Sequence, residues 1–246
     1  MVKGAKTKKS PPKRTGGKRK SVSIVVDHFL DELRVIGDFV DKARAPLPLS
    51  SRYHSWFFDY AIVRLYREFE LFVLKLLIAA IHQDTTTLQQ SAALTLPKKL
   101  PVDVCEFLIV GHGFFDLKGR AGAIGKLKDF LPADHYILSV ISDKKYLDSL
   151  DLLFVLRNFA AHQSKPSKKA ALRVLVERYN RQYPKTTAKK AVSTKGKPKA
   201  KAPPAPQNIG SSGMWLMSQE AGTTRFAKIL KDLKALATDI QSQAPF

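Results

Sequence analysis

Residues 51–82 decide the fold and read SRYHSWFFDYAIVRLYREFELFVLKLLIAAIH. Apolar side chains recur along this stretch at steps of three and four residues, so they form a wide apolar face on a helix. Ser50 or Ser51 can cap the start of this helix, and the cluster Asp84-Thr85-Thr86-Thr87 ends it. The pattern predicts one long helix at the centre of the core.

More helices are predicted on both sides of this stretch. Residues 21–44 have the pattern of an amphipathic helix, which Ala45-Pro46-Leu47-Pro48 ends because each proline disfavours helical backbone in the residue before it. Residues 102–110 fit a strand or a helix by periodicity, and their helical neighbours favour a short helix. Further helices are predicted over residues 123–131, 146–162, 167–179 and 226–236. The chain is therefore predicted to be an all-α helical bundle.

The net charge of +21, from 42 basic and 21 acidic residues, is concentrated in two segments. Residues 1–20 and 180–208 contain no acidic residue and most of the surplus Lys and Arg. Such segments bind phosphate backbones without sequence preference or serve only as soluble linkers. We therefore divide the chain into a disordered basic arm (1–20), a helical domain (21–180), a disordered Lys/Ala/Pro-rich linker (181–213) and an amphipathic C-terminal helix (214–246) that docks on the core or on a partner.

Several classes of protein are not indicated. Cys105 is the only cysteine, so an internal disulfide and a four-cysteine zinc site are impossible, and a reduced cytoplasmic setting is expected. The most apolar stretch, residues 71–81, is too short to span a bilayer, and no export signal precedes it. The chain lacks the H-E-x-x-H, C-x-x-C and G-x-S-x-G motifs, and its glycines between 111 and 125 match neither phosphate-binding pattern. We expect no metal and no cofactor.

One polar constellation stands out, Arg157-Asn158-x-x-x-His162, at the end of a strongly periodic helix. Asn158 and His162 lie on the same face of a helix, whereas Arg157 and His162 are about 140° apart around its axis. A second copy of the chain, or a frayed helix end, would be needed to bring Arg157 and His162 to one phosphate.

The segment Leu156-Arg157-Asn158-Phe159-Ala160-Ala161-His162 resembles the R-x4–6-H motif of HEPN domains (higher eukaryotes and prokaryotes nucleotide-binding). The helix predicted over residues 51–82, with Glu68-Phe69-Glu70, is similar to that family's first long helix. The chain is most like compact bacterial HEPN proteins, including the RiboL-PSP type, that occur with restriction, abortive-infection and toxin–antitoxin systems. The resemblance covers about residues 51–180, and the lysine-rich segments and terminal helices depart from it.

This resemblance implies a homodimer whose motifs face each other across a cleft, and a metal-independent endoribonuclease. His162 would be the general base toward the ribose 2′-OH or the acid for the leaving oxygen, and Arg157 would hold the scissile phosphate. Asn158 would orient the histidine or the phosphate. Glu70 is a candidate for a supporting acid, with a surface or capping role as the alternative.

RNA is therefore the expected partner, and the family adds an antitoxin or a nucleotidyltransferase as further candidates. Some HEPN domains serve only as binding modules and catalyse no reaction. The alternative function is a non-catalytic HEPN-like module that binds RNA, a nucleotide or a protein, and a purely structural helical protein is a third hypothesis.

Overall fold

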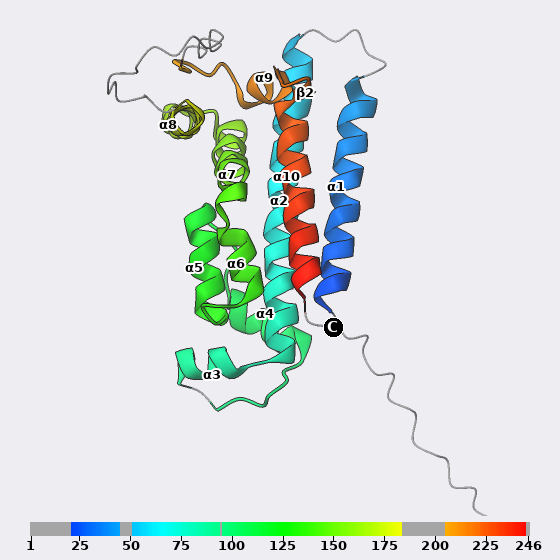
Figure 1. The fold of residues 1–246 in the computed structure, drawn as a ribbon, viewed down its shortest axis with the longest axis vertical. Helices are drawn as coiled ribbons and strands as arrows, with labels where there is room; N and C mark the ends of the chain where they lie inside the picture. Colours follow the sequence, from blue (N-terminus) through cyan, green and yellow to red (C-terminus); the bar gives the residue numbers. More distant parts are fainter. Residues whose placement is uncertain (1–20, 45–50, 94, 184–204, 245–246) are drawn as a thin grey trace, which may run out of the picture.

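The computed structural model describes residues 21–44, 51–93, 95–183 and 205–244, which form a helical bundle with one short β-hairpin (Figure 1). Its helices are α1 (Val22–Arg44), α2 (Ser51–Gln83), α3 (Thr86–Ala92), α4 (Val102–Val110), α5 (Arg120–Phe130), α6 (Tyr136–Ser142), η1 (Lys144–Tyr146), α7 (Leu147–His162), α8 (Lys165–Gln182), α9 (Ser212–Met217) and α10 (Arg225–Gln243). The predicted helical class is confirmed. The predicted basic arm, residues 1–20, and residues 184–204 of the predicted linker lie outside the described residues.

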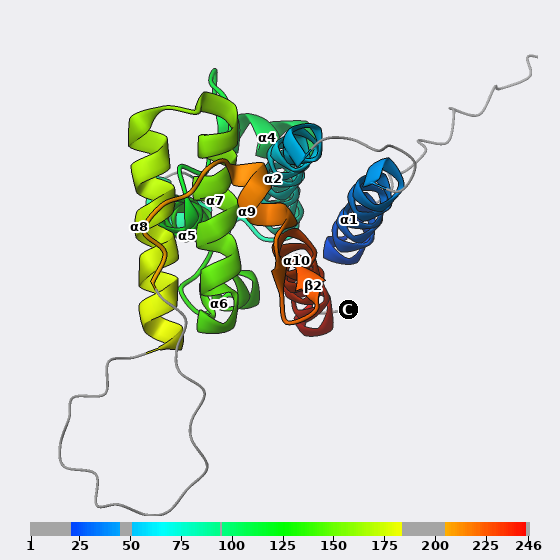
Figure 2. The ribbon, with the colours of Figure 1, turned by 90° about the horizontal axis from the view of Figure 1, so that it is seen from above.

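Helix α2 lies at the centre of the bundle, as its sequence predicts. It contacts α1 on one side, α4 near its end, and α7 and α9 on the other side (Figures 1 and 2). Most residues of its second half are buried, including Phe72, Leu76, Leu77 and Ile81. A helix covered on several sides needs apolar residues around most of its circumference, which explains the density of apolar residues in this stretch.

Helices α1 and α10 pack against each other and run in opposite directions, and α10 runs in the same direction as α2 (Figure 1). Near the end of α10, Gln241 Nε2 donates to Asp27 Oδ1 of α1 at 2.8 Å. Aromatic rings fill the space between these helices and α2. Phe29 stacks on Phe72 with ring centroids 4.1 Å apart, and Phe226 meets Phe58 edge to face at 5.7 Å.

The connection between α7 and α8 consists of two residues. Gln163 adopts a left-handed conformation, with φ at 47°, and its N–H donates to Phe159 O at 2.9 Å. Ser164 then caps α8 in a reciprocal pair of hydrogen bonds with Ser167. Pro166 lies in the first turn of α8 rather than between the two helices. A proline is tolerated there because the first N–H groups of a helix have no partner within it.

The C-terminal segment is more complex than the single helix predicted over residues 214–246. It contains α9, a hairpin of strands β1 (Gln219–Glu220) and β2 (Thr223–Thr224), and then α10. Residues 205–211 fall in the predicted linker, yet Ile209 among them is buried in the core. Strands of two residues are too short to show an alternating pattern in the sequence.

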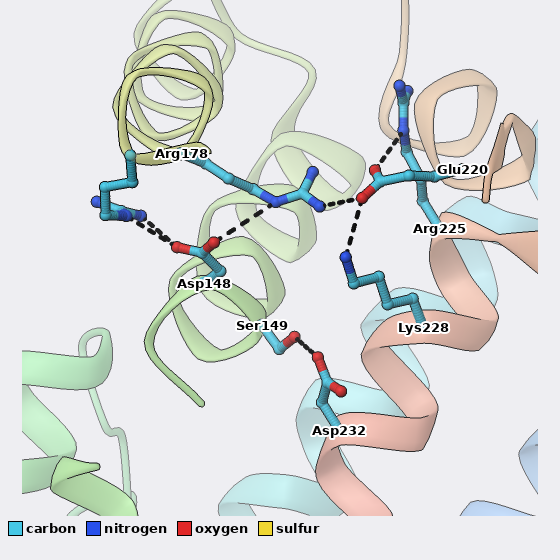
Figure 3. Close-up of polar contacts among 8 residues, drawn as sticks. Asp148, Ser149, Arg178, Glu220, Arg225, Lys228 and Asp232 are labelled. Carbon is cyan, nitrogen blue, oxygen red and sulfur yellow. Dashed lines mark hydrogen bonds and ion pairs between the residues drawn. The ribbon is translucent and has the colours of Figure 1, made fainter. Parts of the chain in front are cut away.

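A cluster of charged side chains attaches this hairpin to α7 and α8 (Figure 3). Arg178, which is buried, contacts the Glu220 carboxylate, and its Nε lies 3.7 Å from Asp148 Oδ2. Glu220 also accepts from Lys228 Nζ at 2.9 Å and lies 3.4 Å from Arg225 Nε. We call these five residues the Glu220 cluster. No helix within the described ranges is long and apolar enough to cross a membrane.

Candidate active site

The three predicted site residues lie in the last turns of α7. Arg157 is half-buried against α2, whereas Asn158 and His162 are exposed one turn apart on the outer face of the helix. This placement agrees with the helical geometry expected from their spacing. The structure therefore joins Arg157 to Asn158, and it leaves His162 on the face of Asn158 and away from Arg157.

The Arg157 guanidinium is held by two uncharged partners. Its central carbon lies 4.3 Å from the centroid of the Tyr66 ring on α2, which is a cation–π contact. Its Nη1 donates to Asn158 Oδ1 at 2.7 Å. Among the described residues Arg157 forms no ion pair, so its charge is not paired with a carboxylate. A guanidinium fixed in this way is prepared to bind an anion such as phosphate.

Tyr66 links Arg157 to a carboxylate on the next turn of α2. Burial raises the pKa of Tyr66, and its hydrogen bond to Glu70 and the charge of Glu70 raise the pKa further, while Arg157 opposes the shift. Glu70 Oε1 also accepts from the Leu117 N–H at 3.4 Å. Glu70 thus lies beside the Tyr66 hydroxyl and the loop before α5. Among the described residues, Glu70 is therefore connected to Arg157 only through the Tyr66 ring.

His162 is the last residue of α7, and the helix stays regular up to it. Within the described part of the chain, His162 makes no hydrogen bond or ring contact. Its imidazole is therefore accessible to a ligand or to another protein surface. Because α7 does not fray before His162, one copy of the chain does not direct Arg157 and His162 at the same point.

Sequence reasoning missed Tyr66 and the loop at Asp116 and Leu117. The spacing of Tyr66 and Glu70, four residues apart, indicates one helical face, but only the packing of α2 on α7 shows that this face meets Arg157. Within the glycine-rich region of residues 111–125, Leu117 supplies the N–H that donates to Glu70.

Other chemistries have little support in the described residues. Cys105 is fully buried, and burial raises the pKa of its thiol, so its reactive thiolate is disfavoured. Within the described ranges, no group of three or more His, Cys, Asp or Glu side chains is arranged to hold a metal ion. No family model, curated protein or solved structure matches this chain. Function is therefore inferred from the surroundings of Arg157 and His162.

Proposed function

We propose that this protein is a metal-independent endoribonuclease of the HEPN type whose active site is completed by a second copy of the chain. The observation that carries the proposal is the state of Arg157, a half-buried guanidinium that Tyr66 and Asn158 hold and that has no carboxylate partner among the described residues. Such a group binds a phosphodiester through two parallel hydrogen bonds. We further propose, from the HEPN resemblance alone, a role in a defence or toxin–antitoxin system, with an antitoxin or nucleotidyltransferase as a further partner.

The second copy supplies the histidine that one chain cannot bring to Arg157. In a two-fold dimer with the α7 ends facing each other, Arg157 of one copy lies opposite His162 of the other. Both exposed side chains, Asn158 and His162, would then face the cleft rather than solvent. Each dimer has two equivalent sites of this kind.

The reaction is an internal transfer at phosphorus. The His162 imidazole accepts the proton of the ribose 2′-OH, the 2′ oxygen forms a bond to phosphorus, and the bond from phosphorus to the 5′ oxygen breaks. The departing 5′ oxygen takes a proton from water, and the hydroxide that remains is neutralised by the proton on His162, which restores the neutral imidazole. The products carry a 2′,3′-cyclic phosphate and a 5′-hydroxyl. Arg157 stabilises the negative charge that accumulates on the phosphoryl oxygens, and Asn158 fixes the direction of its guanidinium.

The test is incubation of the purified protein with total cellular RNA in EDTA, followed by analysis of the fragment ends. We expect cleavage that leaves 2′,3′-cyclic phosphates, and loss of cleavage in Arg157→Ala and His162→Ala. His28→Ala, an exposed histidine on α1, is the matched control and should cleave as the parent does.

Two results would contradict the proposal. Cleavage that persists in His162→Ala would show that another group does the chemistry. A parent protein that binds RNA without cutting it would favour the non-catalytic binding module instead.

A further inference from the structure

A cavity of about 520 Å³ lies where the first turns of α2 and α8 meet the end of α7 and the start of α9. This volume is typical of a site for a small molecule, for which the range is roughly 300–1,000 Å³. Gln163, the residue immediately after His162, lines the cavity. The cavity therefore adjoins the histidine of the candidate active site.

Asp59 supplies an unusual polar group to the cavity wall. Its Oδ1 accepts from the Gly213 N–H at 2.7 Å, and in the described part of the chain this is its one hydrogen-bond partner. Burial raises the pKa of Asp59 to about 6, and the bond from Gly213 opposes the shift. At neutral pH the side chain is thus a carboxylate with most of its acceptor capacity free. Such a group in a cavity is complementary to N–H donors of a ligand.

An aromatic ring and two cations line the same cavity. Trp56 is half exposed, at 51%, and the Arg52 guanidinium lies 5.3 Å from its ring centroid. Lys168, from the first turn of α8, is the second cation. Neither Arg52 nor Lys168 forms an ion pair among the described residues. An aromatic platform beside unpaired cations is the usual surface for an unstacked base and its phosphate.

We propose that this cavity binds one unpaired nucleobase of the RNA substrate, with guanine preferred. The base stacks on Trp56, its N–H groups donate to Asp59, and the adjoining phosphate is held by Arg52 and Lys168. As a subsite for RNA cleavage the cavity rests on the proposed function. As a nucleotide-binding site it stands on its own.

The carboxylate selects the base. Guanine presents two adjacent donors, N1–H and N2–H, that match the two oxygens of Asp59, because Oδ1 can accept a second hydrogen bond beside that from Gly213 and Oδ2 accepts none among the described residues. Adenine and cytosine offer one amino group beside an acceptor. Uracil offers a single N–H between two carbonyl oxygens that a carboxylate repels. We therefore expect the affinity to be highest for guanine and lowest for uracil.

Calorimetric titration of the full-length protein with GMP, AMP, CMP and UMP tests the proposal. GMP should bind most tightly of the four nucleotides. Asp59→Asn keeps the shape of the side chain and the hydrogen bond from Gly213, and it should lower the affinity for GMP by about tenfold to a hundredfold. Asp103→Asn on α4, at the other end of the bundle (Figure 1), is the matched control. Trp56→Ala should lower the affinity for all four nucleotides by about fivefold to a hundredfold. Tyr60→Ala, on the same helix but outside the cavity, should leave these affinities unchanged.

The outcomes separate this proposal from the ribonuclease. Three results would overturn the base pocket, even if the protein cuts RNA. They are equal affinity for the four nucleotides, no binding of any of them, and an Asp59→Asn variant that binds GMP as the parent does. GMP binding that depends on Asp59 in a protein that cuts no RNA would keep the pocket and reject the ribonuclease. Thermal unfolding of each variant confirms that it is folded before it is titrated.

Discussion

Asn158 determines how the Arg157 guanidinium is presented, because its amide oxygen is the one hydrogen-bond acceptor that Arg157 meets among the described residues. Asn158→Ala removes this acceptor and should lower the rate of RNA cleavage by about tenfold. Asn158→Asp keeps the size of the side chain but pairs Arg157 with a negative charge. Its rate should therefore be lower than that of Asn158→Ala, and a higher rate would contradict the role of Arg157 as a phosphate ligand. Both changes are at an exposed position, so stability should be nearly unchanged.

Asp59 costs the protein stability at neutral pH. Its pKa of about 6 in the folded state lies above the ordinary value of 3.8, so the folded protein disfavours the carboxylate and gains stability as the pH falls through 6 toward 3.8. Asp59→Asn should raise the free energy of unfolding by about 1–2 kcal/mol at pH 8, after allowance for the solvent that reaches this side chain. Urea denaturation at several pH values measures the difference, which should disappear below about pH 4. A variant that is less stable than the parent at pH 8 would contradict this origin of the shift.

Among the elements, α9 depends on one close approach to α2. A Cβ at Gly213 would lie 1.8 Å from Ser55 O, whereas a Cβ at Gly125 on α5 would meet nothing within 4 Å. Gly213→Ala should therefore lower the free energy of unfolding by about 2–4 kcal/mol and distort the cavity, because backbone rather than a flexible side chain must move. Gly125→Ala, the matched control, should be neutral or stabilising by about 0.5 kcal/mol. Thermal unfolding of both variants tests this, and similar melting temperatures would refute the close packing of α9.

The Glu220 cluster holds the hairpin and α10 to α7 and α8. Burial alone raises the pKa of Glu220, but hydrogen bonds and charges from Arg178 and Lys228 outweigh burial and lower the pKa to about 2. A lowered pKa means that the stabilisation is present above the ordinary value of 4.5 and is lost as the pH falls toward 2.

Glu220→Gln should therefore lower the free energy of unfolding at pH 7 by about 2–4 kcal/mol, because it leaves the buried Arg178 without its main partner. The difference from the parent should shrink between pH 4.5 and pH 2, which denaturant titrations at these pH values would show. A variant as stable as the parent at pH 7 would mean that the hairpin is held by apolar packing alone.

The sequence predicts the elements with strong periodicity and misses those set by tertiary contacts. Residues 21–44 and 147–162 form helices in the structure as expected from their apolar spacing, and residues 102–110 form the short helix that their helical neighbours favoured. Helix α6 was missed because Tyr136–Ser142 is short and most of it is buried on several sides, so it has no single apolar face. The hairpin is held by the contact between Glu220 and Arg178, which lie 42 residues apart in the chain. No local sequence pattern indicates this contact.

In the whole molecule, the candidate site too is predictable from the sequence only where its residues lie close together in the chain. Arg157, Asn158 and His162 were found because they lie within six residues of one helix. Tyr66 and the cavity residues Trp56 and Asp59 were not singled out as site residues, because their role depends on the packing of α2 against α7 and α9. The sequence geometry also indicated that Arg157 and His162 diverge, and the regular end of α7 leaves a second copy of the chain as the means of joining them.

Mixing two inactive variants tests this central claim most directly. We expect Arg157→Ala and His162→Ala to be inactive when each is assayed alone. The two variants are then mixed, allowed to exchange subunits, and assayed for RNA cleavage in EDTA. If each site combines Arg157 of one copy with His162 of the other, half of the dimers are mixed and each keeps one intact site, so about a quarter of the parent activity should return. A mixture that exchanges subunits but stays inactive would contradict a site shared between two copies.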